Sequence, residues 1–154
     1  VNDKMPNIKT LVVDDWQYMS SFEYFERANE KGYDKFTQIA ANLAQVAKMP
    51  KDMRDDLTVI FLTHSEDSTD INGNRKVKAK TIGKMIDNTL TLEGLFSIVL
   101  FGKVNKNDDG ELVYGFETQN NGENTCKSPM GMFEDLFIPN DLAYVKECIQ
   151  KYEE

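Results

Sequence analysis

Two short apolar runs define the hydrophobic pattern of the first half of the chain. Residues 8–13 are Ile-Lys-Thr-Leu-Val-Val, and residues 57–63 are Leu-Thr-Val-Ile-Phe-Leu-Thr. Runs of this length, rich in β-branched residues, are typical of buried strands. The apolar residues between them recur at helical spacing. This order predicts a βαβ unit, in which two parallel strands are joined by a right-handed crossover.

The segment between the two runs predicts two helices. Ser20 and Glu23 have the spacing of a capping box, so we expect a helix that begins at Ser20 and ends near Gly32. Asp34 can cap a second helix, which ends before Pro50. The second helix has an apolar stripe that consists of Phe36, Ile39, Ala40, Leu43, Val46 and Ala47.

The pattern becomes more polar after the second run. Residues 65–80 predict a long exposed loop or a loose hairpin, and residues 81–95 can hold a short helix. Residues 96–104 and 112–118 are strand-like, and Asn107-Asp108-Asp109-Gly110 joins them. A turn sequence between two such runs predicts an antiparallel hairpin.

The C-terminal part predicts a loop and a final helix. Glycine and proline punctuate residues 120–132, which is typical of a loop. Asn140 can cap a helix that runs to Tyr152. The whole pattern predicts one α/β domain over residues 1–154, with parallel strands that lead into an antiparallel hairpin and helices packed on the sheet.

Composition and charge narrow the classes of partner. The formal net charge is -8, and this acidic surface repels nucleic acid except at a local basic patch. Cys126 and Cys148 lie far apart in the sequence, which gives no support for a disulfide framework or a zinc site. Free thiols fit the reducing cytoplasm. No run approaches the roughly 18 apolar residues of a membrane span, so we expect a cytoplasmic protein without membrane contact.

The residues with most chemical potential are the acids that end the first apolar run, Leu11-Val12-Val13-Asp14-Asp15. Open α/β sheets bind ligands at the carboxyl ends of their strands. Asp14 can hold Mg²⁺ against a nucleotide phosphate, and Asp15 can orient or deprotonate an attacking water. The alternative is that both acids are solvated groups at the end of a strand.

Thr63 and His64 follow the second apolar run directly. If the two strands are neighbours, these side chains project beside Asp14. There they could sense a γ-phosphate or position the water. The alternative is that the histidine, the only one in the chain, forms a structural hydrogen bond.

The order of several runs resembles the RecA-like ATP-binding proteins of bacteriophages. That group has an AAA-type domain and relatives among the single-strand annealing recombinases. The likeness covers nearly the whole chain and includes Thr-Leu-Val-Val-Asp-Asp and Val-Ile-Phe-Leu-Thr-His. The runs that carry it are residues 10–15, 36–39, 59–64, 76–80, 83–85, 118–122 and 128–133.

The resemblance implies a RecA-like P-loop NTPase core with ATP and Mg²⁺ as cofactors. Asp14 would be the Walker B magnesium aspartate, and Asp15 would be the acid that activates water. Thr63 and His64 would occupy the sensor position, and the segment after His64 would be a DNA-binding loop. The parent protein would act in phage DNA recombination, annealing or replication as a homo-oligomeric ring or filament in the bacterial host cytoplasm.

The sequence departs from this group at the phosphate loop. A Walker A loop has the pattern Gly-x-x-x-x-Gly-Lys-Ser/Thr. The only Gly-Lys pairs are Gly83-Lys84 and Gly102-Lys103, and neither is followed by Ser or Thr. We therefore expect the chain to be the Walker B half of a longer ATPase whose phosphate loop lies ahead of Val1, and to be inactive alone.

A basic cluster lies within the polar segment. In an extended chain its alternating lysines share one face, which could track a single-stranded DNA backbone or reach a neighbour's phosphate. The alternative is a solvated loop or a protected edge strand. The cluster comprises Arg75, Lys76, Lys78, Lys80 and Lys84.

Three further hypotheses stay open. Lys127, in the late Gly- and Pro-containing loop, could contact a nucleotide in trans as a finger. The chain could instead be a degenerate, non-catalytic interaction module. It could also be a metal-dependent nuclease that adds Glu66 and Asp67 to the acid pair Asp14 and Asp15.

Overall fold

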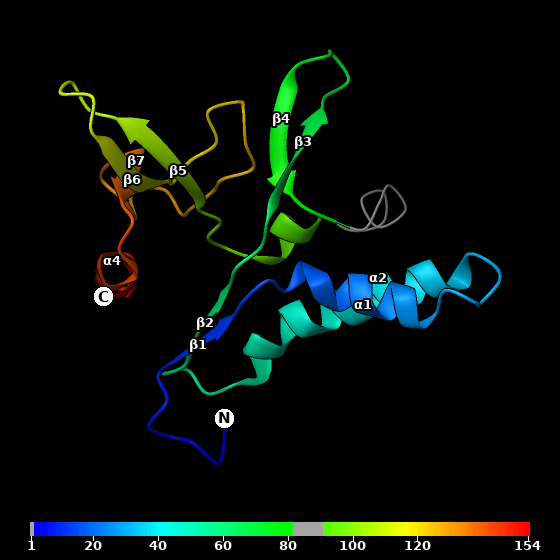
Figure 1. Cartoon of the computed structure of the whole chain (residues 1–154). Helices are drawn as coiled ribbons and strands as arrows, with labels where there is room; N and C mark the ends of the chain where they lie inside the picture. Colours follow the sequence, from blue (N-terminus) through cyan, green and yellow to red (C-terminus); the bar gives the residue numbers. More distant parts are fainter. Residues whose placement is uncertain (1, 82–90) are drawn as a thin grey trace. The chain divides into compact units, whose positions relative to one another are not determined.

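The computed structural model describes residues 2–81 and 91–154. The chain divides into two compact units, the first formed by residues 1–66 with 79–95 and the second by residues 67–78 with 96–154. Both units mix helices with small sheets (Figure 1), so the predicted α/β class is confirmed. No helix in the described part of the chain is long and apolar enough to cross a membrane.

The first unit contains the predicted pair of parallel strands. β1 (Thr10–Val13) and β2 (Thr58–Phe61) align so that Thr10 is opposite Thr58 and Val13 is opposite Phe61. The prediction that β1 is fully buried is wrong, because its residues alternate between exposed and half-buried and Val12 is 47% exposed. Among the described residues this sheet has only two strands, so the outer edge of β1 is not paired with a further strand.

Two helices connect these strands, α1 (Gln17–Glu26) and α2 (Asp34–Lys48), and a 3-10 turn, η1 (Met49–Asp52), follows. The predicted cap at Ser20 is wrong, because Ser20 lies inside α1 and its hydroxyl donates to the Gln17 carbonyl over 2.7 Å. A turn at residues 14–16 joins β1 to α1. α2 does begin at Asp34, but that residue occupies the first turn and makes no side-chain cap.

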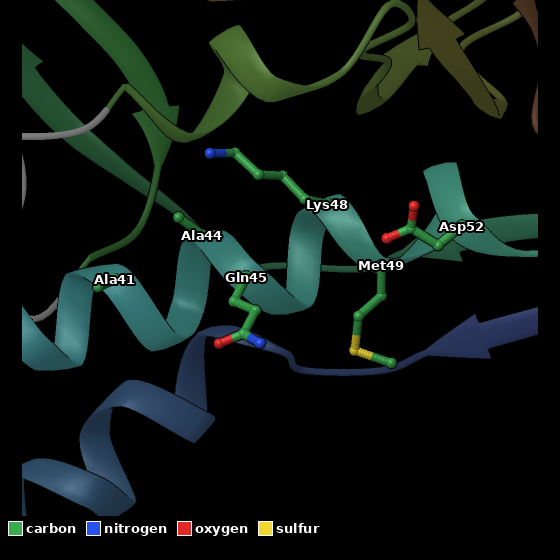
Figure 2. A pocket seen from close by; sticks show the side chains of 6 residues that line it. All are labelled: Ala41, Ala44, Gln45, Lys48, Met49 and Asp52. Carbon is green, nitrogen blue, oxygen red and sulfur yellow. The ribbon is translucent and has the colours of Figure 1, made fainter.

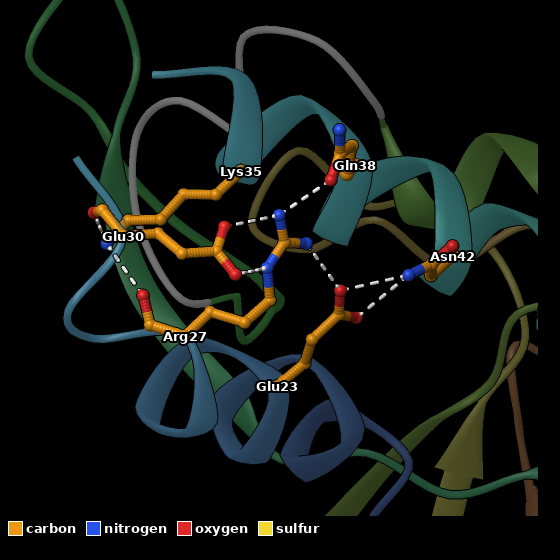
Figure 3. A network of polar contacts seen from close by, with 6 residues as sticks. All are labelled: Glu23, Arg27, Glu30, Lys35, Gln38 and Asn42. Carbon is orange, nitrogen blue, oxygen red and sulfur yellow. Dashed lines mark hydrogen bonds and ion pairs between the residues drawn. The ribbon is translucent and has the colours of Figure 1, made fainter. Parts of the chain in front are cut away.

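The α1–α2 pair has a small apolar centre and a polar clasp. Ile39 and Ala40 are buried in α2 and pack against Tyr24 of α1. Figure 3 shows the clasp, in which the Arg27 guanidinium contacts Glu30 within the loop and Gln38 on α2. The hydrogen bonds from Arg27 hold the pKa of the Glu30 carboxyl below its usual value. The network consists of Glu23, Arg27, Glu30, Lys35, Gln38 and Asn42.

The polar segment after β2 forms a hairpin, as one of the two predicted alternatives. β3 (Ser65–Thr69) and β4 (Arg75–Ala79) pair in a two-stranded sheet. Asp70 shapes the turn, since its carboxylate accepts hydrogen bonds from the backbone N–H groups of Asn72 and Asn74, each at 2.8 Å. Of the helix predicted within residues 81–95, the structure describes a 3-10 turn, η2 (Leu92–Leu95).

The second unit contains the predicted hairpin and one additional strand. β5 (Phe101–Lys106) pairs antiparallel with β6 (Leu112–Glu117), and β6 pairs antiparallel with β7 (Phe137–Pro139). The sequence pattern did not predict β7. The final helix, α4 (Leu142–Glu153), is capped by Asp141 instead of Asn140, because the Asp141 carboxylate accepts from the Ala143 N–H.

Candidate functional site

The predicted site lies where β1 and β2 end. Their pairing continues past both strands, because Leu62 N–H donates to the Val13 carbonyl over 2.9 Å and Trp16 N–H donates to the Leu62 carbonyl over 3.2 Å. These bonds keep the two chain segments adjacent for several residues beyond the sheet. The acids that follow β1 and the histidine that follows β2 are therefore brought to the same edge.

Asp15 and His64 are in direct contact. The His64 Nε2 atom lies 3.0 Å from the Asp15 Oδ1 atom, and both side chains are about half exposed. The Gln17 Nε2 atom donates to the same Oδ1 atom over 3.2 Å. Asp15 adopts a φ of 51°, a left-handed conformation that aspartate tolerates better than most residues. This conformation turns the chain from β1 into α1.

A buried aromatic residue anchors this turn. Trp16 is 2% exposed, and its ring meets the Phe61 ring edge-on with centroids 5.2 Å apart. The Tyr18 ring approaches His64 edge-on at 6.0 Å. The side chain that follows the acid pair is thus fixed by packing against β2, which supports a defined position for Asp15.

Asp14 and Thr63 are exposed and lie beside this contact in the chain. The Thr63 hydroxyl donates to the His64 carbonyl over 3.4 Å. Within the described ranges, no group of three or more His, Cys, Asp or Glu side chains is close enough to hold a metal ion. Any metal at Asp14 would therefore need most of its ligands from water or from a bound phosphate.

The basic cluster lies on and next to β4. Lys76 and Lys78 alternate along this extended strand, and the Lys80 N–H donates to the His64 carbonyl over 2.8 Å. Arg75 forms an ion pair with Asp67, with Nη2 and Oδ1 2.8 Å apart. β4 is extended over Arg75–Ala79, which is the conformation in which the alternating lysines share one face. The remaining member, Lys84, lies outside the described residues.

Lys127 belongs to the second unit. It is half-buried, and its backbone pairs with Val99 through two hydrogen bonds of 2.8 and 3.0 Å. Asp67, which the nuclease hypothesis adds to the acid pair, forms an ion pair with Arg75 instead. Lys127 and Asp67 both belong to the second unit, whereas Asp15 belongs to the first.

Each unit contains a cleft among its described residues. Figure 2 shows the first, of about 380 Å³, whose lining comes from α2 and η1 and includes Lys48 and Asp52. The second, of about 490 Å³, lies within the second unit between the hairpin and a loop, where Arg75 and Glu123 are among its lining residues. Neither cleft is lined by Asp14, Asp15 or His64.

Sequence reasoning missed one polar residue of the site, Gln17. This residue is the first of α1 and is 4% exposed. A glutamine directly after Asp-Asp-Trp carries no signal on its own. Its contact with Asp15 depends on α1 beginning at this residue, directly after the backbone bond from Trp16 to Leu62.

Comparisons with protein-family models, with curated proteins and with solved structures found no match. The chemistry of the site has to be inferred from its own residues.

Proposed function

We propose that this chain carries the metal-binding and water-activating half of an ATP-hydrolysing site in a RecA-like protein that acts on DNA. The observation that carries the proposal is the 3.0 Å contact between Asp15 and His64 at the carboxyl end of a parallel strand pair. Ligands of open α/β sheets bind at that end of the strands. An exposed acid, Asp14, precedes the contact directly.

Asp14 is suited to Mg²⁺ in this proposal. In nucleotide sites Mg²⁺ commonly uses one or two carboxylates and completes its octahedron with water and phosphate oxygens, so a single exposed carboxylate fits this donor set. A bound Mg²⁺ would neutralise charge that develops on the phosphates. The chain contains no Walker A sequence, so the phosphates themselves would be held by residues outside this sequence.

Asp15 is suited to orienting the attacking water. Its carboxylate is half exposed, so it is accessible to solvent, and it is held through one oxygen by His64. An acid that is fixed in place loses less entropy when it accepts a hydrogen bond from water in the transition state. His64 and Thr63 would couple this carboxylate to the state of the nucleotide.

The DNA partner is proposed from charge. The chain has a formal net charge of -8. Lys76 and Lys78 on β4, with Lys80 directly after it, form a local basic patch in this acidic chain. Such a strip suits the phosphate backbone of single-stranded DNA. In a ring or filament of identical subunits, Lys127 would be the finger that reaches the nucleotide of a neighbour.

The test is steady-state ATP hydrolysis with Mg²⁺, with and without single-stranded DNA. The assay uses the full-length protein that contains this chain. We expect Asp15→Asn to lower kcat about 100-fold or more, because it removes the group that accepts the water's proton. Asp14→Asn should raise the Mg²⁺ concentration needed for turnover. Asp108→Asn, which removes an exposed acid from the β5–β6 turn, is the matched control and should have no effect.

The alternatives give different results in the same assay. Turnover that is unchanged in Asp15→Asn would refute the proposal. DNA cleavage that needs Mg²⁺ but no nucleotide would support the nuclease hypothesis, and the absence of any ATP-dependent activity would support the interaction module.

A further inference from the structure

The Gln17 side chain is buried and incompletely hydrogen-bonded. Gln17 is 4% exposed, and its Oε1 atom has no hydrogen-bond partner among the residues that the structure describes. No other buried side-chain nitrogen or oxygen in the described part of the chain is left in this state. An unsatisfied buried carbonyl costs about 1–3 kcal/mol, so its presence requires a physical reason.

The reason lies in the other end of the same amide. The Gln17 Nε2 atom donates to Asp15 Oδ1 over 3.2 Å. If the amide were rotated by half a turn, its carbonyl oxygen would face the carboxylate and repel it. The hydrogen bond to Asp15 therefore sets the orientation of the Gln17 amide. In this orientation the side-chain carbonyl oxygen of Gln17 has no hydrogen-bond partner among the described residues.

Both contacts to the Asp15 carboxylate fall on one oxygen. His64 Nε2 and Gln17 Nε2 approach Oδ1 from different elements, the segment after β2 and the start of α1. Within the described residues, Oδ2 has no hydrogen-bond or ion-pair partner, and the Asp15 side chain is 49% exposed. The two contacts thus hold Oδ1 in place, and Oδ2 belongs to a side chain that is about half exposed.

We infer that Gln17 is a positioning residue, which holds the Asp15 carboxylate through Oδ1 so that Oδ2 is presented to the attacking water. This inference rests on the proposed function for its catalytic consequence, whereas the contact itself does not depend on that function. Gln17 acts through Asp15 and does not touch the reacting atoms.

The kinetic test is a double-mutant cycle of Gln17→Met and Asp15→Ala in the ATPase assay. Methionine fills a similar volume without a hydrogen-bond donor. We expect Gln17→Met to lower kcat about tenfold with little change in the KM for ATP, and to have no further effect once Asp15 is alanine. A Gln17→Met effect that persists undiminished in the Asp15→Ala background would overturn the inference.

A stability measurement separates this role from a purely structural one. Gln17→Met removes the unsatisfied carbonyl, so its thermal midpoint should equal or exceed that of the unchanged chain. Ser20→Ala is the matched control, because it removes a buried hydrogen bond in the same helix without touching Asp15. That bond runs from the Ser20 hydroxyl to the backbone carbonyl of Gln17. Ser20→Ala should lower the thermal midpoint and leave kcat unchanged, and the reverse pattern would overturn the inference.

An activity-independent measurement distinguishes failure of this inference from failure of the proposed function. The Gln17 side-chain amide protons should exchange slowly with water in an NMR experiment, because they are buried and donated to a carboxylate. Asp15→Ala should move their resonance and speed their exchange, whereas Asp108→Ala should not. An unchanged resonance in Asp15→Ala would overturn the role of Gln17 even in an active ATPase. A changed resonance in a protein without ATP hydrolysis would refute only the proposed function.

Discussion

Gly115 on β6 is the position at which one added methyl group should disturb the second unit most. A Cβ atom built there would lie 2.3 Å from Phe137 Cζ and 2.5 Å from the Ile138 carbonyl oxygen. Carbon atoms in contact are normally about 3.5–4.0 Å apart. The phenyl ring could rotate away, but the Ile138 oxygen belongs to the backbone of β7, which is paired with β6. The Gly115→Ala substitution therefore has to push β7 outward.

The expected cost follows from two contributions. Overpacking of this kind costs about 1–3 kcal/mol. Displacement of β7 also begins to expose Ile138, which is 1% exposed and whose full burial is worth about 1.5–3 kcal/mol. We expect a loss of about 2–4 kcal/mol, which lowers the urea midpoint by about 1–2 M for an m-value of about 2 kcal/mol/M.

Urea unfolding followed by circular dichroism measures this loss, and amide hydrogen exchange in β6 and β7 locates it. Gly102→Ala is the matched control, because Gly102 lies on the neighbouring strand β5 and a Cβ atom there would meet nothing within 4 Å. That variant should be neutral or slightly more stable, since alanine loses less conformational freedom on folding. Equal midpoints for the two alanine variants would refute the close approach of β7 to Gly115.

Three other predictions concern the first unit and the hairpin. Ile39→Ala should lower the free energy of unfolding by about 2–5 kcal/mol, because Ile39 is 0% exposed and its removal leaves a cavity; a thermal midpoint unchanged by circular dichroism would contradict its central position. Arg27 lowers the pKa of Glu30 from its ordinary 4.5, so the stabilisation is complete above that pH and is lost as the pH falls through the lowered value. Thermal melts of Glu30→Gln should accordingly depend less on acid pH than those of the unchanged chain, and identical pH dependence would exclude this linkage. Charge reversal at Lys78 and Lys80 should weaken single-stranded DNA binding and reduce its salt dependence. An unaltered slope of log K against log salt would show that the hairpin does not contact the DNA.

The sequence was sufficient for elements that have a local signature. The two apolar runs predicted β1 and β2 and their parallel pairing, and Asn107-Asp108-Asp109-Gly110 predicted the β5–β6 hairpin. The same reasoning placed His64 at the edge where β1 ends, because residues that end neighbouring parallel strands share an edge. It placed His64 beside Asp14, however, whereas the structure shows the contact with the next residue, Asp15. Those inferences need only the period of the pattern and one topological rule.

The missed features depend on contacts between distant residues. β7 has three residues, Phe137–Pro139, which is too short a run for any periodicity, and it exists because Gly115 lets it approach β6. The start of α1 at Gln17 instead of Ser20 depends on the bond from Trp16 to Leu62, which joins residues far apart in the sequence. The contact of Gln17 with Asp15 depends on this start of α1, so the sequence pattern could not predict it.

Trp16 gives the candidate site its own optical signal. It is the only tryptophan in the chain, it directly follows Asp15, and its buried ring lies against Phe61 at the end of β2. A metal ion, a nucleotide or a substitution at Gln17 that shifts the backbone of Asp15 also shifts the residue that carries this indole. Its intrinsic fluorescence can therefore follow occupancy of the site in real time, without an attached dye and without a turnover assay.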